Sequence, residues 1–463
     1  MRTPTSPIRP EPAGPPPAGA QPTAEQPTAE QSTAEQPTAE QPTAQPQRIL
    51  LLVLSATMLI DALEVSIVVV ALPSIAGGLR IPMPAAQWLM SGFALGFGGM
   101  LLFGGRVVDR LGQRRVYLAA LLAYAAMCIV SGLSPDAGVL IASRVARGCC
   151  AALTAPTGLA IIARTFPEGS ARNRALAIYA AFGASGFTAG LLLSGLLTQL
   201  DWRWTLMFPA PVALVLVAVG WRVIPRTQPG PARRYDVGGA VTLARAAALL
   251  PLRPLAHGTL TRAGLAAAAL NGSYWGLLFI ATFRLQDGLG WQPLPTALAF
   301  LPASVPPMLA APFARSLVRR LGARRLVVAG LLAATAGYAV ALVRPPVAYA
   351  GELLPVLLLV GLGYVGAFSG LHMHALSGVP ADAARTATGV YQSLVQIGGA
   401  LVLAVVAALN ASYPGYRPAF AVLTAVSVFG VAAVLVSRPD RSHSHREGMR
   451  SNDRGSRREV GLR

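Results

Sequence analysis

Residues 105–115 read Gly-Arg-Val-Val-Asp-Arg-Leu-Gly-Gln-Arg-Arg, a basic turn between two long apolar runs. The pattern Leu-Gly-x-Arg-Arg of residues 111–115 returns at residues 321–325, again between two apolar runs. A second pair of positions, Tyr179 and Gly186 against Tyr391 and Gly398, keeps nearly the same offset. Such a repeat indicates two duplicated halves, as in membrane folds built from parallel repeats.

The composition favours a lipid bilayer as the surroundings of this chain. Of its 463 residues, 54% are hydrophobic and only 12% are charged, which is more apolar than a soluble core of this size requires. The net charge of +19 comes from arginines in short loops and in the C-terminal tail, so membrane topology explains it better than a nucleic-acid partner does.

The same chain has no signature of an enzyme. It contains no Walker motif, no metal-ligand spacing of cysteines and no Ser/His/acid set in a soluble domain. We therefore expect no catalytic residue, no metal and no cofactor, and an ATP-driven pump is disfavoured. Cys128, Cys149 and Cys150 lie in apolar runs and are interpreted as small buried hydrophobic residues.

Twelve apolar segments are expected to cross the membrane as helices, since each is near the roughly 20 residues that a crossing needs. They lie near 49–73, 86–107, 115–134, 137–163, 173–199, 204–223, 263–284, 294–316, 325–343, 353–378, 387–411 and 416–437. The prediction is an all-α membrane protein with an N-terminal six-helix half, 48–224, and a C-terminal six-helix half, 263–437. Prolines inside these segments, such as Pro156 and Pro302, are expected to bend their helices.

Three further segments surround the two halves. Residues 1–47, rich in Pro, Gln, Thr and Ala, and the basic tail 438–463 are expected to be disordered. Residues 225–262 form the predicted linker, in which 237–252 is a helix at the membrane surface or in the cytosol, or else one extra span. Arginines gather in the loops after the second, fourth, sixth, eighth and tenth spans, so both termini are expected to be cytoplasmic in a cell membrane.

Two acids lie inside the first span. Asp61 and Glu64 are three residues apart and therefore share one helix face. A carboxylate at that depth faces a cavity, finds a partner or is protonated, so proton binding and a purely structural role are both open.

Two arginines in the fourth span complement these acids in charge. Arg144 and Arg147 stay charged, so each must face water or pair with a carboxylate. Pairing with Glu64 or Asp61 would couple proton binding to the state of the cavity. The structural alternatives are an anchor for Arg144 and a side chain that reaches the membrane surface for Arg147.

Other candidates are small or polar residues in apolar spans. Gly186, Gly190 and Gly195 in the fifth span have a spacing that permits close helix packing, either static or at a mobile interface between the halves. A cavity for a large amphipathic ligand is expected in the second half, lined by Asn271, Tyr274, Trp275, His372, Tyr391 and Gln392.

At the basic turn the chain resembles the major facilitator superfamily, whose loop between spans two and three reads Gly-x-x-x-Asp-Arg-x-Gly-x-Arg-Arg. The matching residues are Gly105, Asp109, Arg110, Gly112, Arg114 and Arg115. The resemblance implies that this loop takes part in the conformational switch. The second copy has Arg319 in place of Asp109, so this role is carried over to the first copy alone.

More narrowly, residues 63–73 resemble the first-span motif of the drug:proton antiporters that normally have fourteen spans. Glu64 stands at the acidic position of that motif, and Val69 replaces its Asn. Arg144 stands at the position of the fourth-span arginine implicated in proton transfer, with Arg147 where the family has Gln. In the fifth span, Leu191 replaces the proline of the antiporter motif.

The resemblance implies a monomeric secondary transporter that works by alternating access and exports drugs or secondary metabolites in exchange for protons. Glu64 would take a proton from outside and release it inside, with Arg144 setting its proton affinity. Two alternatives stay open: an uptake transporter or facilitator without proton antiport, and a transport-inactive membrane sensor or scaffold.

Overall fold

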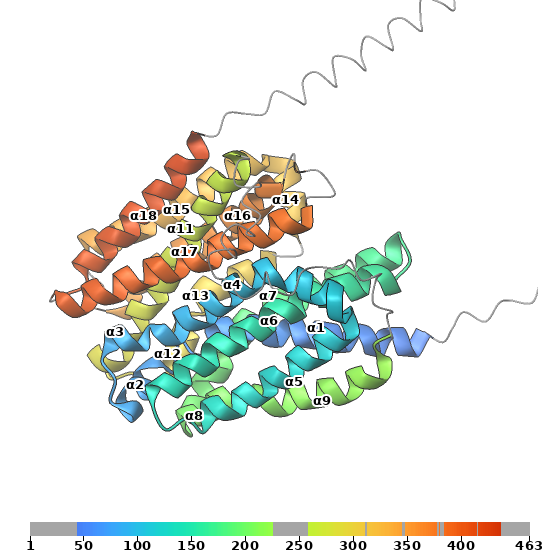
Figure 1. The fold of residues 1–463 in the computed structure, drawn as a ribbon. Helices are drawn as coiled ribbons and strands as arrows, with labels where there is room; N and C mark the ends of the chain where they lie inside the picture. Colours follow the sequence, from blue (N-terminus) through green and yellow to red (C-terminus); the bar gives the residue numbers. More distant parts are fainter. Residues whose placement is uncertain are drawn as a thin grey trace, which may run out of the picture. The chain divides into compact units, whose positions relative to one another are not determined.

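The computed structural model describes residues 44–225, 258–310, 313–344, 348–376, 379, 384–413 and 415–436. These residues form helices and turns, and those from Gln45 onward belong to one compact unit (Figure 1). The expected linker helix 237–252 and the C-terminal tail lie outside the described residues. The first helix begins at Ala44, so the last residues of the expected N-terminal tail are helical.

The N-terminal half contains six long helical segments with short helices at their ends. Its elements are α1 (Ala44–Ser66), α2 (Leu72–Leu79), α3 (Met83–Ala86), α4 (Trp88–Leu111), α5 (Gln113–Gly132), α6 (Ala137–Thr165), α7 (Ser170–Thr198), α8 (Trp202–Met207) and α9 (Pro209–Val223).

The C-terminal half repeats this order with more breaks. Its elements are α11 (Gly258–Phe283), the π-helical turn η3 (Arg284–Gly288), α12 (Pro293–Ala299), α13 (Leu301–Ala310), α14 (Ala314–Leu321), α15 (Ala323–Val343), the π-helical turn η5 (Tyr349–Leu353), α16 (Leu354–Leu376), α17 (Ala384–Ser412) and α18 (Arg417–Leu435).

Among the described residues, eleven helices are long and apolar enough to cross a membrane, and the bent pair α12–α13 makes a twelfth. The two helices of that pair meet at an angle of 49°. Pro302 explains the break, because its nitrogen cannot donate to the carbonyl of Leu298 one turn earlier. Pro156 lies inside α6, which continues as an α-helix from Ala137 to Thr165.

The first span differs from the expected continuous helix over 49–73. Its helix ends at Ser66, residues 67–71 form turns, and α2 starts at Leu72. The β-branched run of Ile67 and three valines disfavours helix, and Pro73 has no N–H to donate. The break leaves main-chain carbonyls near the middle of the span available to other helices.

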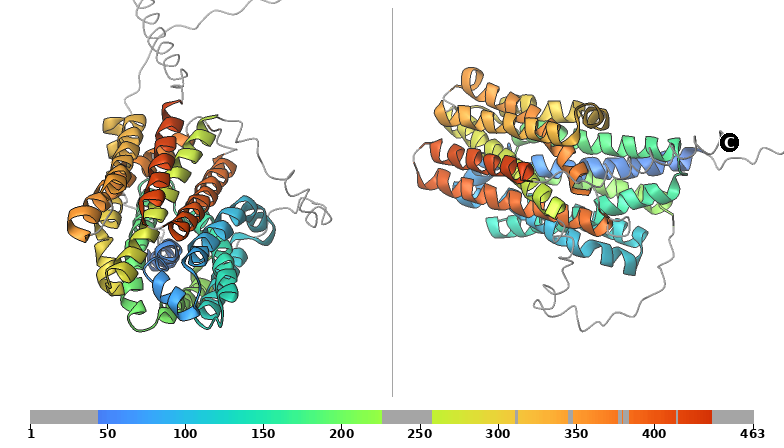
Figure 2. Two further views of the ribbon diagram at one scale, coloured as in Figure 1. Left: turned by 90° about the vertical axis from the view of Figure 1, so that its left-hand side faces the viewer. Right: turned by 90° about the horizontal axis from the view of Figure 1, so that it is seen from above.

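The two halves meet along α4 with α17 and along α7 with α12 and α13 (Figure 2). Across the first contact, Ser393 Oγ donates to the Gly98 carbonyl at 2.6 Å. Across the second, Thr188 Oγ1 donates to the Ser304 carbonyl at 3.2 Å. A third link uses the break in the first span, since Gln286 Nε2 donates to the Val70 carbonyl at 2.8 Å.

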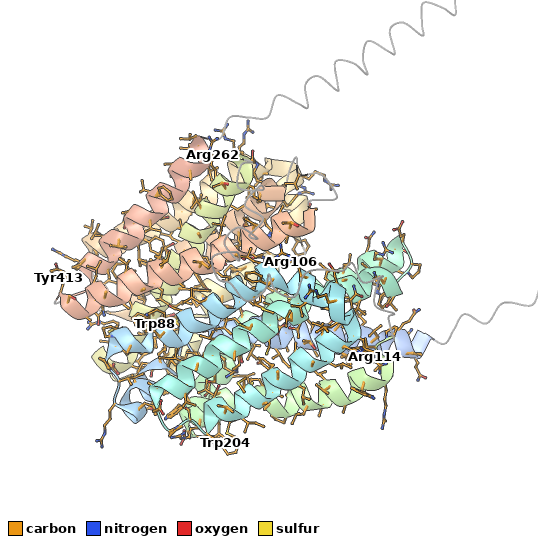
Figure 3. All side chains as sticks on the ribbon, viewed as in Figure 1. Trp88, Arg106, Arg114, Trp204, Arg262 and Tyr413 are labelled. Atoms are coloured by element: carbon orange, nitrogen blue, oxygen red, sulfur yellow. The ribbon has the colours of Figure 1, made fainter. Side chains whose placement is uncertain are left out.

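The exposed side chains at the two ends of the helices differ in type, as expected for a membrane protein. Figure 3 shows Trp88, Trp204 and Tyr413 towards one end of the helices and Arg106 and Arg114 towards the other. These three aromatic residues are about half exposed, which matches an aromatic belt at a membrane interface. Between the ends, large apolar side chains such as those on α9 and α18 are exposed, and lipid would cover them.

Candidate functional site

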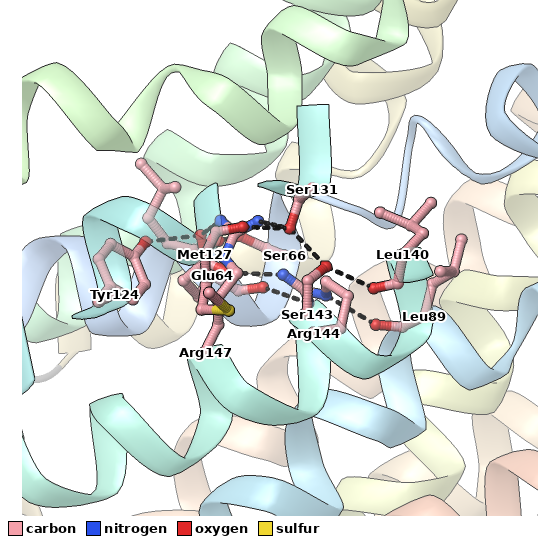
Figure 4. A network of polar contacts seen from close by, with 11 residues as sticks. Glu64, Ser66, Leu89, Tyr124, Met127, Ser131, Leu140, Ser143, Arg144 and Arg147 are labelled. Carbon is pink, nitrogen blue, oxygen red and sulfur yellow. Dashed lines mark hydrogen bonds and ion pairs between the residues drawn. The ribbon is translucent and has the colours of Figure 1, made fainter. Parts of the chain in front are cut away.

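The core of the site is Glu64, which is 0% exposed in the last turn of α1. Its Oε2 accepts a hydrogen bond of 2.5 Å from Arg144 Nη1. Its Oε1 accepts from Arg147 Nη2 and from the hydroxyl of Tyr124, the latter at 2.7 Å. Figure 4 shows these contacts between α1, α5 and α6. Every partner of this carboxylate is a donor, which is the arrangement that an ionised glutamate needs.

Arg144 ties three helices together. In addition to the ion pair, its Nε donates to the Leu89 carbonyl of α4 at 2.9 Å, and its Nη2 donates to the Glu64 carbonyl at 3.0 Å. That carbonyl is available because α1 ends two residues later, at Ser66. The guanidinium carbon lies 5.1 Å from the centre of the Phe93 ring, so an aromatic face covers the charge.

Arg147 is as deeply buried as Glu64, at 0% exposed. Its Nη1 donates to Ser131 Oγ at 3.3 Å, and its guanidinium lies over the ring of Tyr124 at 5.4 Å. The structural alternative of a side chain reaching the membrane surface is therefore wrong for Arg147. Its Nε has no hydrogen-bond partner among the described residues.

The charges of this cluster do not cancel. Arg144 and Arg147 bring two positive charges and Glu64 brings one negative charge, all of them buried. Removing one partner of a buried ion pair typically costs about 3–5 kcal/mol, because the other charge is left without compensation. The cluster therefore depends on the ionised form of Glu64 and carries one excess positive charge.

Asp61 lies one turn before Glu64 and has different surroundings. It is 8% exposed, and its Oδ2 lies 2.8 Å from Thr154 Oγ1 of α6. The two acids thus share a face of α1, as their spacing predicts, but only Glu64 contacts the arginines.

Glycines bring the helices close enough for these contacts. A Cβ atom on Gly148 would lie 2.1 Å from the Phe93 carbonyl oxygen, and one on Gly96 would lie 2.1 Å from that of Val145. These two positions fix the crossing of α4 and α6 directly beside Arg147.

The glycines expected to pack in α7 fall into two sets. Cβ atoms on Gly186 and Gly190 would collide with the α1 backbone, at 2.5 Å from the Leu59 oxygen and 2.7 Å from the Leu63 oxygen. Gly195 instead faces α12 of the other half, where a Cβ would lie 2.5 Å from that of Ala297. Close packing explains all three, and only Gly195 lies at the interface between the halves.

The basic turn joins α4 to α5. Gly112 separates the two helices with a φ of 83°, and Arg114 donates from Nη2 to the Trp221 carbonyl of α9. Gly105, Asp109 and Arg110 lie in the last two turns of α4, and Arg115 is exposed in the first turn of α5. The structure thus places all six residues at one helix-to-helix corner.

The residues expected to line a substrate cavity make polar and ring contacts within the second half. Tyr364 OH donates to Asn271 Oδ1 at 3.3 Å, and its ring centre lies 4.9 Å from that of Tyr274. His372 meets Tyr391 edge to face at 5.2 Å. Trp275 lies one turn after Asn271 on α11, faces Gly399 of α17 as Asn271 does, and lines a small void with Arg144 of the other half. Gln392 follows Tyr391 on α17 and is half-buried.

A larger cavity opens at the end of the interface where α2 and η3 lie. Its volume is about 510 Å³, and both halves line it, with Pro73 and Met83 from the first and Asp287 and Asn410 from the second. This size is within the range of cavities that hold small organic molecules.

Several residues of the site were not predicted from the sequence. Tyr124, Ser131 and Thr154 all contact the charged cluster or Asp61. The available signal was a polar side chain in the middle of an apolar span, which is costly without a partner. No group of three or more His, Cys, Asp or Glu residues within the described part of the chain could hold a metal ion.

Comparisons with known proteins agree with this architecture. The sequence profile of the Major Facilitator Superfamily matches residues 54–403. The puromycin resistance protein of Streptomyces alboniger is 34% identical over 404 residues, which cover 76% of this chain and 80% of that protein. The cephamycin export protein of Amycolatopsis lactamdurans is 32% identical over 407 residues, which cover 77% and 83% of the two chains.

Among solved structures, that of the nucleoside transporter NupG covers 83% of this chain and 98% of its own, with a TM-score of 0.64. At 14% sequence identity this likeness shows the fold alone. The profile match and the two relatives go further. The chain belongs to the major facilitator superfamily and is a multi-pass membrane transporter.

Proposed function

We propose that this transporter exports an antibiotic-like small molecule out of the cell in exchange for protons. The observation that carries the proposal is Glu64, a fully buried carboxylate held by Arg144, Arg147 and Tyr124 in the last turn of α1, where the first span breaks. Buried ionisable clusters of this kind are expensive in a bilayer, and transporters use them to bind protons or ions.

The relatives support the direction and the class of substrate. They are named for puromycin resistance, for cephamycin export and for tetracenomycin C resistance and export. All three names refer to antibiotics, which are small organic molecules with apolar surface. We infer that this chain takes a compound of the same general class.

The mechanism that fits is alternating access, in which the halves rock about a central substrate site. Proton coupling would involve Asp61, Glu64 and Arg144, and Arg144 would transmit the change because it binds α1, α4 and Glu64 together. The basic turn at Gly112 would act as part of the switch. The cavity near Asp287 would be the vestibule on the outer side.

The proposed orientation has both termini in the cytoplasm and the protein in the cell membrane, acting as a monomer. The arginines at the α4–α5 corner would then lie inside, by the positive-inside rule.

The amphipathic substrate would meet aromatic rings in the second half, including Tyr274, Tyr364 and Trp275.

Export from cells tests the proposal. Cells that produce the wild type or Glu64→Gln at equal levels would be loaded with a panel of antibiotics and dyes, with and without a protonophore. We expect the wild type to lower accumulation of at least one compound and both the mutation and the protonophore to abolish this effect. Full export by Glu64→Gln would refute the role of the cluster.

A second function has one observation in its favour. Leu191 stands where the antiporter motif has proline, and α7 runs through it as an unbroken helix from Ser170 to Thr198. Facilitated diffusion without proton exchange would fit such a change. Transport that continues undiminished after collapse of the proton gradient would select this alternative.

A further inference from the structure

Asp61 and Glu64 stand in contrasting surroundings, which separates their roles. Glu64 is surrounded by three donors, two of them guanidinium groups. A proton on Glu64 would remove the negative charge between Arg144 and Arg147, and of the three donors only the Tyr124 hydroxyl could accept its hydrogen. In the conformation seen here, the contacts of Glu64 favour its ionised form.

Within the described part of the chain, Asp61 has no ion-pair partner comparable to those of Glu64. The groups that face it are Tyr117 of α5, Cys150 and Thr154 of α6 and Tyr179 of α7, with Glu64 on its own helix. None of these groups carries a positive charge. A buried carboxylate with a single hydroxyl partner is unfavourable, whereas the neutral acid needs only one acceptor for its proton.

The hydroxyl of Thr154 provides that acceptor. Thr154 Oγ1 lies 2.8 Å from Asp61 Oδ2, 3.1 Å from the Ala151 carbonyl and 3.3 Å from the Cys150 carbonyl. The hydroxyl has one hydrogen, and a carbonyl oxygen can only accept. If Asp61 is protonated, it donates to Thr154 Oγ1 and the Thr154 hydrogen goes to the Ala151 carbonyl, so each donor is satisfied.

We infer that Asp61 holds the exchangeable proton of the first span, whereas Glu64 remains ionised as the fixed counterion of Arg144 and Arg147. Two observations make release of the proton feasible. Asp61 keeps 8% exposure while Glu64 has none, so Asp61 is the more accessible acid. The arginine cluster one turn away carries an excess positive charge, which favours an anion at Asp61 once the proton leaves.

The role of Asp61 in coupling rests on the proposed function, but its protonation can be measured without transport. Infrared spectra of the purified protein in lipid vesicles, recorded against pH, show the carbonyl stretching band of a protonated carboxyl. We expect one such band at neutral pH in the wild type and its loss in Asp61→Asn. The variant should fold, because the asparagine amide can donate to Thr154 Oγ1 as the acid does.

Thr154 supplies the matched controls. In Thr154→Val the band should remain and move to higher frequency, because the proton loses its acceptor, and Thr154→Ser should restore the wild-type position. The band should shift when the wild type is moved into D₂O, since the proton exchanges with solvent.

Several results would overturn the inference. They are a wild type without the band at neutral pH, a band that survives in Asp61→Asn, and a band that does not shift in D₂O. These outcomes are distinct from failure of the proposed function, which would show as export that ignores the protonophore while the band follows Asp61.

Discussion

Arg114 and Arg324 make the same contact in the two halves of the molecule. Each guanidinium donates through Nη2 to a main-chain carbonyl near the end of the last helix of its own half, that of Trp221 in α9 and that of Leu435 in α18, the latter at 3.0 Å. The duplicated basic turn thus closes each half by fixing its third span to its sixth. Its cations also lie near the negative end of those helix dipoles.

The glycine of this turn should be sensitive to substitution. Gly112 and Gly322 have φ angles of 83° and 81°, a region that a residue with Cβ enters only at a cost. Gly112→Ala is expected to lower the free energy of unfolding by about 1–3 kcal/mol. Thermal unfolding of the purified protein in detergent measures the loss.

Gly105 is the matched control, because it lies in the same motif but inside α4, and a Cβ there meets nothing within 4 Å. Gly105→Ala should leave the stability unchanged or slightly raise it, since alanine favours helix. Equal destabilisation by both substitutions would show that the φ angle is not the cause.

Much of the fold could be predicted because the length of each apolar segment and the repeated basic turn can be read from short stretches of the sequence. The bilayer sets the length of each span, and the sequence marks the corners with Leu-Gly-x-Arg-Arg. The break of the first span after Ser66 was not predicted, although the valine run and Pro73 were visible. Helix continuity in a membrane depends on whether other helices bind the released carbonyls, as Gln286 does at Val70.

Prediction was less complete for the site. Pairing of the arginines with Glu64 or Asp61 followed from charge, because opposite buried charges need each other, but the choice of Glu64 is seen only in the structure. The contact of Asp61 with Thr154 depends on how α1 crosses α6, which no local pattern specifies. The common cavity expected for the residues of the second half stays a prediction, although the structure shows some of them in contact with aromatic neighbours, as His372 is with Tyr391.

The crossing of α4 and α6 should depend on Gly148. An added methyl group would lie 2.1 Å from the Phe93 carbonyl oxygen, and backbone cannot move aside as a flexible side chain can. Gly148→Ala is expected to destabilise the protein by about 1–3 kcal/mol or more. Fluorescence-detected size exclusion after heating would measure the loss of folded protein.

The control for this prediction is Gly99→Ala on α4, where a Cβ meets nothing within 4 Å. It should behave as the wild type. Gly148 directly follows Arg147, so Gly148→Ala should lower export as well as stability. A stable Gly148→Ala protein that exports normally would contradict the close packing.

The charge balance of the cluster predicts an order among substitutions. Arg147→Gln leaves one carboxylate, Glu64, with one guanidinium, Arg144, so its buried charge is balanced. Glu64→Gln leaves two buried guanidiniums without a counter-charge and should cost about 3–5 kcal/mol. Arg147→Gln should cost clearly less, and the two unfolding temperatures measure the difference.

The opposite order would mean that Arg147 contributes more through Ser131 and Tyr124 than through its charge.

The conservative substitution Arg144→Lys separates charge from geometry. A lysine keeps the positive charge but cannot make all three contacts of the guanidinium, to the Leu89 carbonyl and to both the side chain and the carbonyl of Glu64. Arg144→Lys should therefore remain less stable than the wild type.

Trp275 is the aromatic residue that meets the charged cluster across the interface. It is 4% exposed on α11, and it borders the same small void as Phe93 and Arg144 of the other half. An aromatic substrate that enters between the halves would lose one ring contact in Trp275→Ala, worth about 0.5–1.5 kcal/mol. The half-saturating concentration for such a compound should rise by about two- to tenfold. Trp204→Ala, at an exposed aromatic residue of α8, should leave that concentration unchanged. If both substitutions weaken export equally, the effect lies in membrane anchoring and Trp275 does not contact the substrate.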